Sequence, residues 1–278
     1  MRVVYSLPDA QLHQDSVVTI GAFDGVHLGH RAVIDSVRQA ALACGCASAV
    51  VTFFPHPSVV LGRAEPFYLT STEEKIAALE TLGIDWVVVM NFTVEMSHTR
   101  AADYVSMLID HLHMREVHVG YDFTFGYKRE GTVAFLERMG AERGFRVHPI
   151  QALTNGDEPI SSTGIRRALR EGNVELAAHW LGRPFRLSGT VTRGEGSAVQ
   201  LDVWPEHAIP ADGVYTCRAE AGGAKTAALV TIGTQVMAEK KSIRSVAAQL
   251  REMERHREGE RVSLEFLARL RGATGKPA

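Results

Sequence analysis

The sequence has little cysteine, no strong excess of charge and no long apolar run. Only Cys44, Cys46 and Cys217 are present among 278 residues. This odd number, with two cysteines in a Cys-Gly-Cys segment, does not indicate a disulfide framework or a zinc site, so we expect reduced thiols. Lysine and arginine number 30 against 32 aspartate and glutamate residues, a net charge of −2. That balance gives no bulk attraction for nucleic acid.

Membrane-spanning and secreted classes are also disfavoured. No uninterrupted apolar run reaches membrane-spanning length. After seven residues the N-terminus becomes polar, so it lacks the apolar region of a signal peptide. The length of the whole chain corresponds to about two domains, and its content of 45% hydrophobic residues is ordinary for a globular protein. We therefore expect a cytoplasmic protein that binds neither nucleic acid nor membranes; the sequence leaves its oligomeric state open.

Over the first 150 residues, short apolar segments alternate with amphipathic ones. The predicted strands are residues 17–21, 48–54, 85–90, 116–120 and 145–150. The predicted helices are residues 30–42, 75–82, 99–111 and 132–144, the second of them opened by a capping box at residues 71–74. This alternation predicts an α/β domain with a parallel sheet covered on both faces. Ligands of such sheets bind at the carboxyl ends of the strands.

The pattern changes after residue 186 to short β-like runs separated by glycine-rich turns. These runs predict a small antiparallel barrel or sandwich. A charged segment from about Ser242 to Arg257 predicts a helix, and a last strand follows. We therefore expect two domains, residues 1–186 and 187–278, the second ending in a C-terminal helix and strand.

Histidines and glycines follow the first predicted strand in the segment GAFDGVHLGH, residues 21–30. His27 and His30 precede a predicted helix, whose free N–H groups and dipole attract phosphate. Gly25 and Gly29 allow a close approach of the backbone. Such a pair could neutralise phosphate charge during nucleotidyl transfer. The alternative is that two unrelated histidines lie in a turn. A zinc-binding pair is a third interpretation, but no third ligand occurs at a spacing typical of zinc sites.

A second predicted helix start carries hydroxyl and arginine side chains. Ser162 and Thr163 lie in its first turn, and Arg166 and Arg167 follow. Hydroxyls and N–H groups there could hold the β- and γ-phosphates, with arginine binding them in a bidentate way. An ordinary N-cap with solvent-facing arginines is the alternative.

Two aromatic segments follow other predicted strands. FFPHP, residues 53–57, is a rigid loop that could form a slot for a planar ring. GYDFTFG, residues 120–126, places Asp122 between aromatic residues, where its carboxylate could bind magnesium or a ribityl hydroxyl. A hydrophobic plug and an Asx-turn are the respective alternatives.

Taken in order, GAFDGVHLGH, TFFPHP, VGYDFTFG and ISSTGIRRALREGNVELAAHWLGRPF resemble the adenylyltransferase module of the bacterial bifunctional riboflavin kinase/FMN adenylyltransferase (FAD synthetase) family. The resemblance covers roughly residues 15–186. It implies a Rossmann-like nucleotidyltransferase domain followed by a riboflavin-kinase-like β-barrel. It also implies direct in-line transfer of AMP from ATP to FMN, which yields FAD and pyrophosphate, with Mg2+ as cofactor and small molecules as the binding partners.

The resemblance also implies roles for individual residues. The catalytic residues would be His27, His30 and Arg166. The remaining ATP and phosphate-binding residues would be Gly21, Phe23, Asp24, Gly25, Gly29, Ser162 and Thr163. The flavin-binding residues would be Phe54, Pro55, His56, Pro57, Asp122 and Phe125, and Asp122 is also the candidate metal ligand.

The chain departs from the family pattern in two places. Gly164 stands where many members carry arginine. In the second domain the family's Pro-Thr-x-Asn motif is absent from the whole sequence, and the family's catalytic glutamate has no matching position; Asp202 and Glu239 are the possible replacements. We therefore expect an FMN adenylyltransferase with a degenerate kinase barrel. A bifunctional enzyme, a different phosphate acceptor, and a flavin- or nucleotide-binding protein without turnover are the alternatives.

Overall fold

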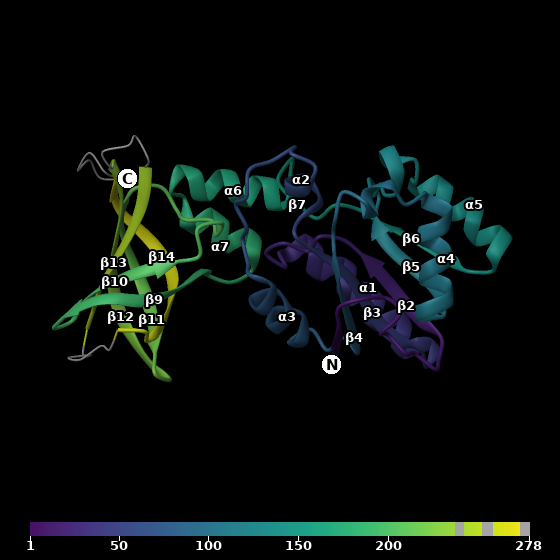
Figure 1. Cartoon of the computed structure of the whole chain (residues 1–278), viewed down its shortest axis with the longest axis horizontal. Coiled ribbons are helices and arrows are strands. Elements are labelled where there is room, and N and C mark those ends of the chain that lie inside the picture. The colour runs from purple at the N-terminus through teal and green to yellow at the C-terminus, as the bar shows by residue number, and fades with distance from the viewer. Residues whose placement is uncertain (237–241, 252–257, 273–278) are drawn as a thin grey trace. The chain divides into compact units, whose positions relative to one another are not determined.

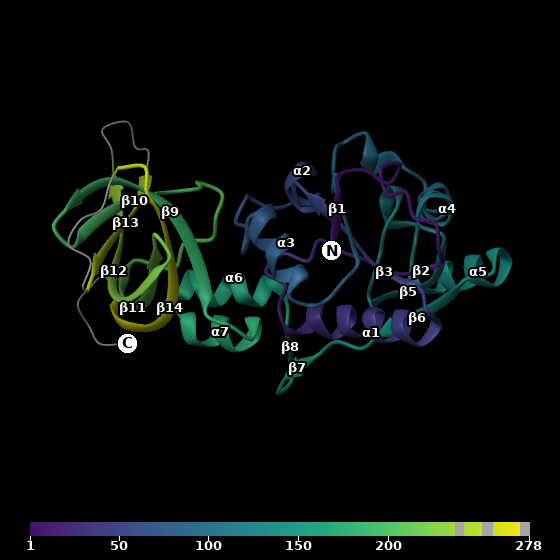
Figure 2. The same cartoon turned by 90° about the horizontal axis from the view of Figure 1, so that it is seen from below.

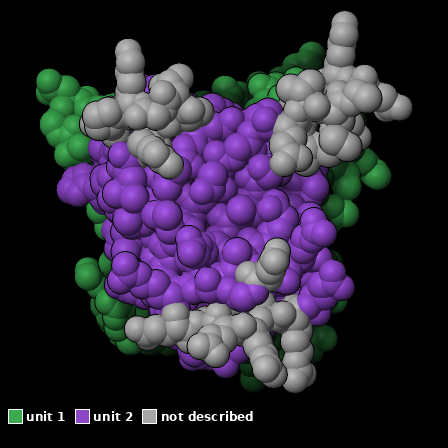
Figure 3. Space-filling model, turned by 90° about the vertical axis from the view of Figure 1, so that its left-hand side faces the viewer, with its two compact units in different colours: residues 1–66, 71–160 green, residues 67–70, 161–278 purple. Residues whose placement is uncertain are grey.

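The computed structural model describes residues 1–236, 242–251 and 258–272, which Figure 1 and Figure 2 show from two directions. The chain divides into two compact units, here called the first and the second unit and coloured separately in Figure 3. The first comprises residues 1–66 and 71–160, and the second residues 67–70 and 161–278. In the described part of the chain, no helix combines the length and apolarity that a membrane crossing needs.

A six-stranded sheet of parallel strands forms the centre of the first unit, in the order β1-β4-β3-β2-β5-β6. The strands are β1 (Arg2–Val4), β2 (Ser16–Ile20), β3 (Ala47–Phe54), β4 (Trp86–Asn91), β5 (Met114–Gly120) and β6 (Arg146–Ile150). This confirms the predicted parallel α/β architecture. The three-residue β1 was not predicted, because it is too short to show a period.

Helices and short turns connect the strands of the first unit. The helices are α1 (Leu28–Cys44), α2 (Pro57–Val60), α3 (Thr72–Glu80), α4 (Ala101–Leu112) and α5 (Val133–Arg143), with the 3-10 turns η1 (Met96–His98) and η2 (Tyr127–Arg129). A two-stranded ribbon is formed by β7 (Thr154–Asn155) and β8 (Glu158–Pro159). The predicted capping box is confirmed, since Ser71 and Glu74 each accept from the other's backbone N–H.

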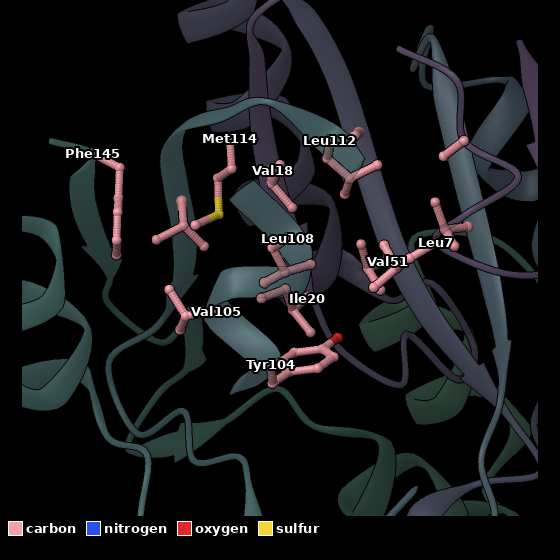
Figure 4. Packing of buried hydrophobic residues seen from close by; sticks show 14 of the residues in the cluster. Leu7, Val18, Ile20, Val51, Tyr104, Val105, Leu108, Leu112, Met114 and Phe145 are labelled. Carbon is pink, nitrogen blue, oxygen red and sulfur yellow. The ribbon is translucent and has the colours of Figure 1, made fainter. Parts of the chain in front are cut away.

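Consecutive strand residues bury opposite faces of this sheet. Val18 and Val51 pack with α4 and α5 in one cluster, part of which Figure 4 shows. Their neighbours Val17 and Val50 pack with α1 and α3 in the other. Strands buried on both faces read as continuous apolar runs, which is why the sequence predicted them.

The second unit contains two helices and a closed antiparallel barrel with the strand order β10-β13-β12-β11-β14-β9. The helices are α6 (Ser162–Glu171) and α7 (Val174–Leu181). The strands are β9 (Phe185–Glu195), β10 (Ala198–Val203), β11 (Gly213–Ala221), β12 (Ala224–Val236), β13 (Ser242–Leu250) and β14 (Arg261–Gly272). The sequence-based domain boundary lies at residues 186/187. The compact units instead divide between residues 160 and 161, so that α6 and α7 belong with the barrel.

Two sequence-based expectations need correction. The helix expected from about Ser242 to Arg257 is wrong over residues 242–250, which form β13. Val246, Ala248 and Leu250 are buried at every second position, and this strand period outweighs the helix-favouring alanine and glutamine. Residues 252–257 lie outside the described residues.

The expectation of reduced thiols also fails for two of the three cysteines. Cys44 and Cys46 form a disulfide, while Cys217 is free and buried. Because the linked residues are two positions apart, the bond connects no separate elements and builds no framework.

Candidate functional site

The turn between β2 and α1 brings His27 and His30 together. His27 is the N-cap of α1, and its Nδ1 accepts from the backbone N–H of His30 at 3.3 Å. The two imidazole rings stack with centroids 3.5 Å apart and an angle of 22° between their planes. His27 is buried, whereas His30 is half-buried. The arrangement places two nitrogen-bearing rings at the N-terminus of a long helix, where its dipole attracts anions.

Backbone conformations in this turn are unusual. Phe23, Gly25 and Val26 all have positive φ angles, of 48°, 84° and 41°. Such conformations are strained for residues with side chains and cluster at binding sites. At position 29 glycine is favoured for a steric reason, because a Cβ there would lie 3.2 Å from the His27 ring. The small residue therefore leaves room for the stacked histidines.

Beneath this turn lies a buried cation that the sequence analysis missed. The Lys75 Nζ donates to the carbonyl oxygens of Ala22 and Phe53 at 2.8 and 3.1 Å and to the Thr52 hydroxyl at 3.2 Å. It thereby ties the segment after β2 to the end of β3. Burial lowers the pKa of Lys75 to about 8, and the nearby Asp24 partly offsets this effect. Lysine on an amphipathic helix usually indicates a solvated face, so only the fold reveals its position.

We expect this burial to make stability depend on pH in a way that Lys75→Met removes. The folded pKa of about 8 lies below the ordinary value of 10.5. The unfolded chain therefore binds more protons between these values, and the stability of the wild type rises with pH in that window. Relative to Lys75→Met, the wild type should gain about 1.5 kcal/mol between pH 8 and about pH 9.5.

Denaturant unfolding at both pH values measures this gain. Lys225→Met removes an exposed lysine and is the matched control. Parallel pH profiles for the wild type and Lys75→Met would contradict the lowered pKa.

A pocket of about 440 Å³ opens in the first unit beside β3, α2 and the segment after β5. Of the predicted flavin residues, His56, Pro57 and Phe125 line it; Phe54, Pro55 and Asp122 do not. Phe54 instead packs on the face of the sheet that α1 and α3 cover. Phe53 lines the pocket, because neighbouring residues of a strand point to opposite faces.

Aromatic and polar groups surround the pocket. Phe125 stacks with Phe123 at a centroid distance of 5.4 Å, and Phe53 meets Phe92 edge-to-face at 5.8 Å. His56 caps α2 by accepting from the Ser58 N–H at 3.1 Å. The volume and the mixture of aromatic walls with a few polar groups suit a planar heterocyclic ligand.

Asp122 is exposed in the turn after β5. Among the described residues it belongs to no group of three possible protein ligands for a metal. Magnesium in nucleotide sites takes most of its oxygens from phosphate and water, so a single carboxylate is compatible with it. The donor set at Asp122 thus fits a metal that arrives with a nucleotide and does not fit a preformed protein cage.

The helix start at residues 161–167 belongs to the second unit. Ser161 is the N-cap of α6, and its hydroxyl accepts from the Gly164 N–H at 3.2 Å. Ser162 and Thr163 form the first turn, and the Arg166 Nε donates to the carbonyl of Phe67 at 2.8 Å. His27 and His30 belong to the first unit.

Packing against Trp180 explains why position 164 is a glycine. A Cβ there would lie 2.2 Å from the indole of Trp180, which is fully buried. The arginine that many members of the resembling family carry at this position cannot fit while Trp180 packs on α6.

Side chains fill the interior of the barrel. Large buried residues include Phe185, Tyr215 and Phe266, and the ring of Phe266 contacts the other two. Asp202 lies on β10 between the buried Leu201 and Val203 and is exposed, so its carboxylate points out of the barrel. Glu239, the other candidate replacement for a kinase carboxylate, lies outside the described residues.

Comparisons with known proteins agree with the sequence motifs. A family model described as FAD synthetase matches residues 9–164, and one described as riboflavin kinase matches residues 181–275. The bifunctional riboflavin kinase/FMN adenylyltransferase of Listeria monocytogenes is 34% identical over 261 residues, covering 91% of this chain and 83% of the relative. The Bacillus subtilis enzyme of the same description is 36% identical over 218 residues, covering 75% and 68%.

A solved structure shares the fold. A Streptococcus pneumoniae protein described as a macrolide-efflux protein matches 100% of this chain and 93% of its own, with a TM-score of 0.89 and 24% identity. At that identity the likeness concerns the fold alone. The sequence matches are closer, and they carry the assignment. The chain is a nucleotidyltransferase and belongs to the bifunctional riboflavin kinase/FMN adenylyltransferase (FAD synthetase) family.

Proposed function

We propose that this protein is an FMN adenylyltransferase, which converts ATP and FMN into FAD and pyrophosphate. The observation that carries the proposal is the stacked pair of His27 and His30 at the N-terminus of α1. It lies within the segment that matches the FAD synthetase model. Nucleotidyl transfer requires positioned positive charge around phosphate more than covalent chemistry by the protein.

Two groups of residues would bind phosphate oxygens of ATP. The strained turn with Gly21, Phe23, Asp24 and Gly25 would let backbone N–H groups approach the phosphates, and His27 and His30 would stabilise charge on the leaving pyrophosphate. Ser162, Thr163 and Arg166 would bind the outer phosphates. No side chain is assigned as a nucleophile, so the FMN phosphate would attack the α-phosphorus directly. Inversion at a chiral α-phosphorothioate is the expected stereochemical result, and retention would contradict it.

The flavin would occupy the pocket beside β3. His56, Pro57 and Phe125 line this pocket, and Phe53 adds a further aromatic wall. Planar ring systems bind favourably against aromatic faces and edges. Phe54 and Pro55 would act indirectly, by shaping the loop that carries His56. Mg2+ would enter with ATP and neutralise phosphate charge, and Asp122 is the candidate protein ligand.

One assay tests the function. Purified protein is mixed with ATP, magnesium and FMN, and the products are separated by chromatography. We expect FAD and pyrophosphate in equal amounts. Parallel reactions with phosphopantetheine and nicotinamide mononucleotide as acceptors test the rival acceptors. Tight binding of FMN and ATP without FAD would instead favour a protein that binds flavin without turnover.

Replacing Phe125 should separate flavin binding from ATP binding. Phe125 also contacts the core residues Tyr104 and Phe135, so truncation to alanine would cost stability. Phe125→Leu keeps most of the volume and is expected to weaken FMN binding about fivefold, since an aromatic contact contributes about 1 kcal/mol beyond area burial. ATP binding should remain unchanged. Titration of each ligand measures the two affinities.

Phe145→Leu is the matched control for this variant. Phe145 belongs to the same hydrophobic cluster but does not line the pocket. Equal losses of FMN affinity in Phe125→Leu and Phe145→Leu would show a general effect on packing and remove the support for the flavin pocket.

Riboflavin phosphorylation by the barrel is a second candidate function. The riboflavin kinase model matches residues 181–275, and the related proteins are bifunctional by description. The chain nevertheless contains no Pro-Thr-x-Asn segment. We therefore propose that the barrel has lost kinase activity.

A further inference from the structure

A cluster of polar side chains lies on the α1 face of the sheet, away from the residues assigned to ATP and FMN. Glu116 and His118 are two positions apart on β5 and so point to the same face. His118 pairs with His148 of β6 in the parallel register. A carboxylate oxygen of Glu116 and one ring nitrogen of each histidine lie within 4.8 Å of one another. Glu116 and His118 are buried, and His148 is half-buried.

The two distances from Glu116 to the histidines are close to those between neighbouring ligands of one tetrahedral metal ion. The Glu116 Oε2 lies 3.0 Å from the His148 Nε2 and 3.5 Å from the His118 Nε2. Zinc bonds to histidine nitrogen and carboxylate oxygen of about 2.1 Å place neighbouring tetrahedral ligands about 3.4 Å apart. The Nε2 of His148 is buried yet makes no well-directed hydrogen bond, despite its short distance to the carboxylate. A shared cation would satisfy that nitrogen.

Neighbouring groups orient these side chains. The Nδ1 of His118 lies 2.6 Å from the Ser36 hydroxyl on α1. If Nδ1 carries the proton and donates it to Ser36, the lone pair of Nε2 faces the cluster, as in metal sites whose histidines are fixed by an outer partner. Arg146 pairs with the other oxygen of Glu116 and leaves Oε2 for the histidines.

We propose that Glu116, His118 and His148 bind a divalent transition-metal ion of the zinc type, with water as its fourth ligand. Two histidines and one carboxylate form a donor set that suits zinc, whereas magnesium and calcium prefer oxygen ligands. The ion would join the edge strand β6 to the inner strand β5.

Zinc binding by the full chain tests the site. Protein stripped with a chelator and then freed of it is titrated with zinc chloride near neutral pH by calorimetry. We expect one zinc ion per chain and a thermal midpoint that rises with zinc concentration. Cobalt in place of zinc should give the visible absorption bands of a four-coordinate site. Absence of saturable zinc binding would overturn the proposal.

Variants locate the ion and separate it from other histidines. His148→Gln keeps a polar side chain but not the ligand, and it should weaken zinc binding at least about 100-fold. Glu116→Gln should do the same, which guards against a folding defect of either variant. Ser36→Ala should weaken binding about tenfold to 100-fold through the orientation of His118. His13→Gln alters an exposed histidine and should change nothing. Wild-type affinity in both His148→Gln and Glu116→Gln would place the ion elsewhere and refute the site.

Discussion

Replacing His30 with alanine is expected to lower kcat for FAD formation by about 10²-fold or more, the usual effect of losing one preorganised electrostatic donor. His30 is the better target of the two stacked histidines. His27 is buried and caps α1 through its Nδ1, so its removal would also cost about 1 kcal/mol of helix stability. The part of His30 in that contact is its backbone N–H, which alanine retains. Single-turnover and steady-state rates with ATP and FMN measure the effect.

Two controls separate a loss of catalysis in His30→Ala from a loss of stability or of FMN binding. The midpoint of denaturant unfolding should stay close to that of the wild type, because the His30 side chain is half-buried at the surface of the turn. The affinity for FMN should also change little, since His30 does not line the pocket proposed for the flavin. A fully folded His30→Ala protein with wild-type turnover would show that the stacked histidines do not act on the phosphates.

The sequence predicted the sheet because its strands are apolar at consecutive positions. Val17 and Val18, like Val50 and Val51, face opposite clusters, so each strand is visible as an uninterrupted run. The pairing of His27 with His30 was also accessible, because a helix start fixes their spacing. Patterns within short stretches of the sequence therefore predicted the sheet and the proposed phosphate-binding turn.

Features that depend on contacts between residues distant in the sequence could not be predicted. The absence of arginine at position 164 follows from the indole of Trp180, which only the fold places against α6. Lys75 is buried because it reaches the ends of β2 and β3. Glu116 and His148 meet through the pairing of β5 with β6.

The direction in which a strand residue points is harder to predict. Phe54 is a predicted flavin residue that packs with the cluster beneath α1 and α3, whereas Phe53 lines the pocket proposed for the flavin. A pair of identical residues gives no sign of which one faces which side. In β13 the composition favoured a helix, while the burial of alternate residues required a strand.

The barrel's lack of kinase activity is the second prediction with a large expected effect. A riboflavin kinase has to bind the magnesium of ATP and to deprotonate a ribityl hydroxyl, which is a poor nucleophile near neutral pH. The family's Thr and Asn for the metal are missing, because no Pro-Thr-x-Asn segment occurs in the chain. The exposed Asp202 points away from the packed barrel interior, which contains Tyr215 and Phe266. Loss of a positioned base alone costs about 10²- to 10⁴-fold in rate.

With riboflavin, ATP and magnesium, we therefore expect no FMN and no FAD above the background without enzyme. FMN added afterwards to the same reaction should be converted to FAD, which shows that the protein is active and that ATP is intact. Chromatography of samples taken before and after this addition provides both measurements from one preparation. Asp202→Asn should leave the two results unchanged, because that exposed carboxylate has no part in the proposed reaction. Rapid formation of FMN from riboflavin would refute the loss of kinase activity, and its disappearance in Asp202→Asn would identify the carboxylate that replaced the family's own.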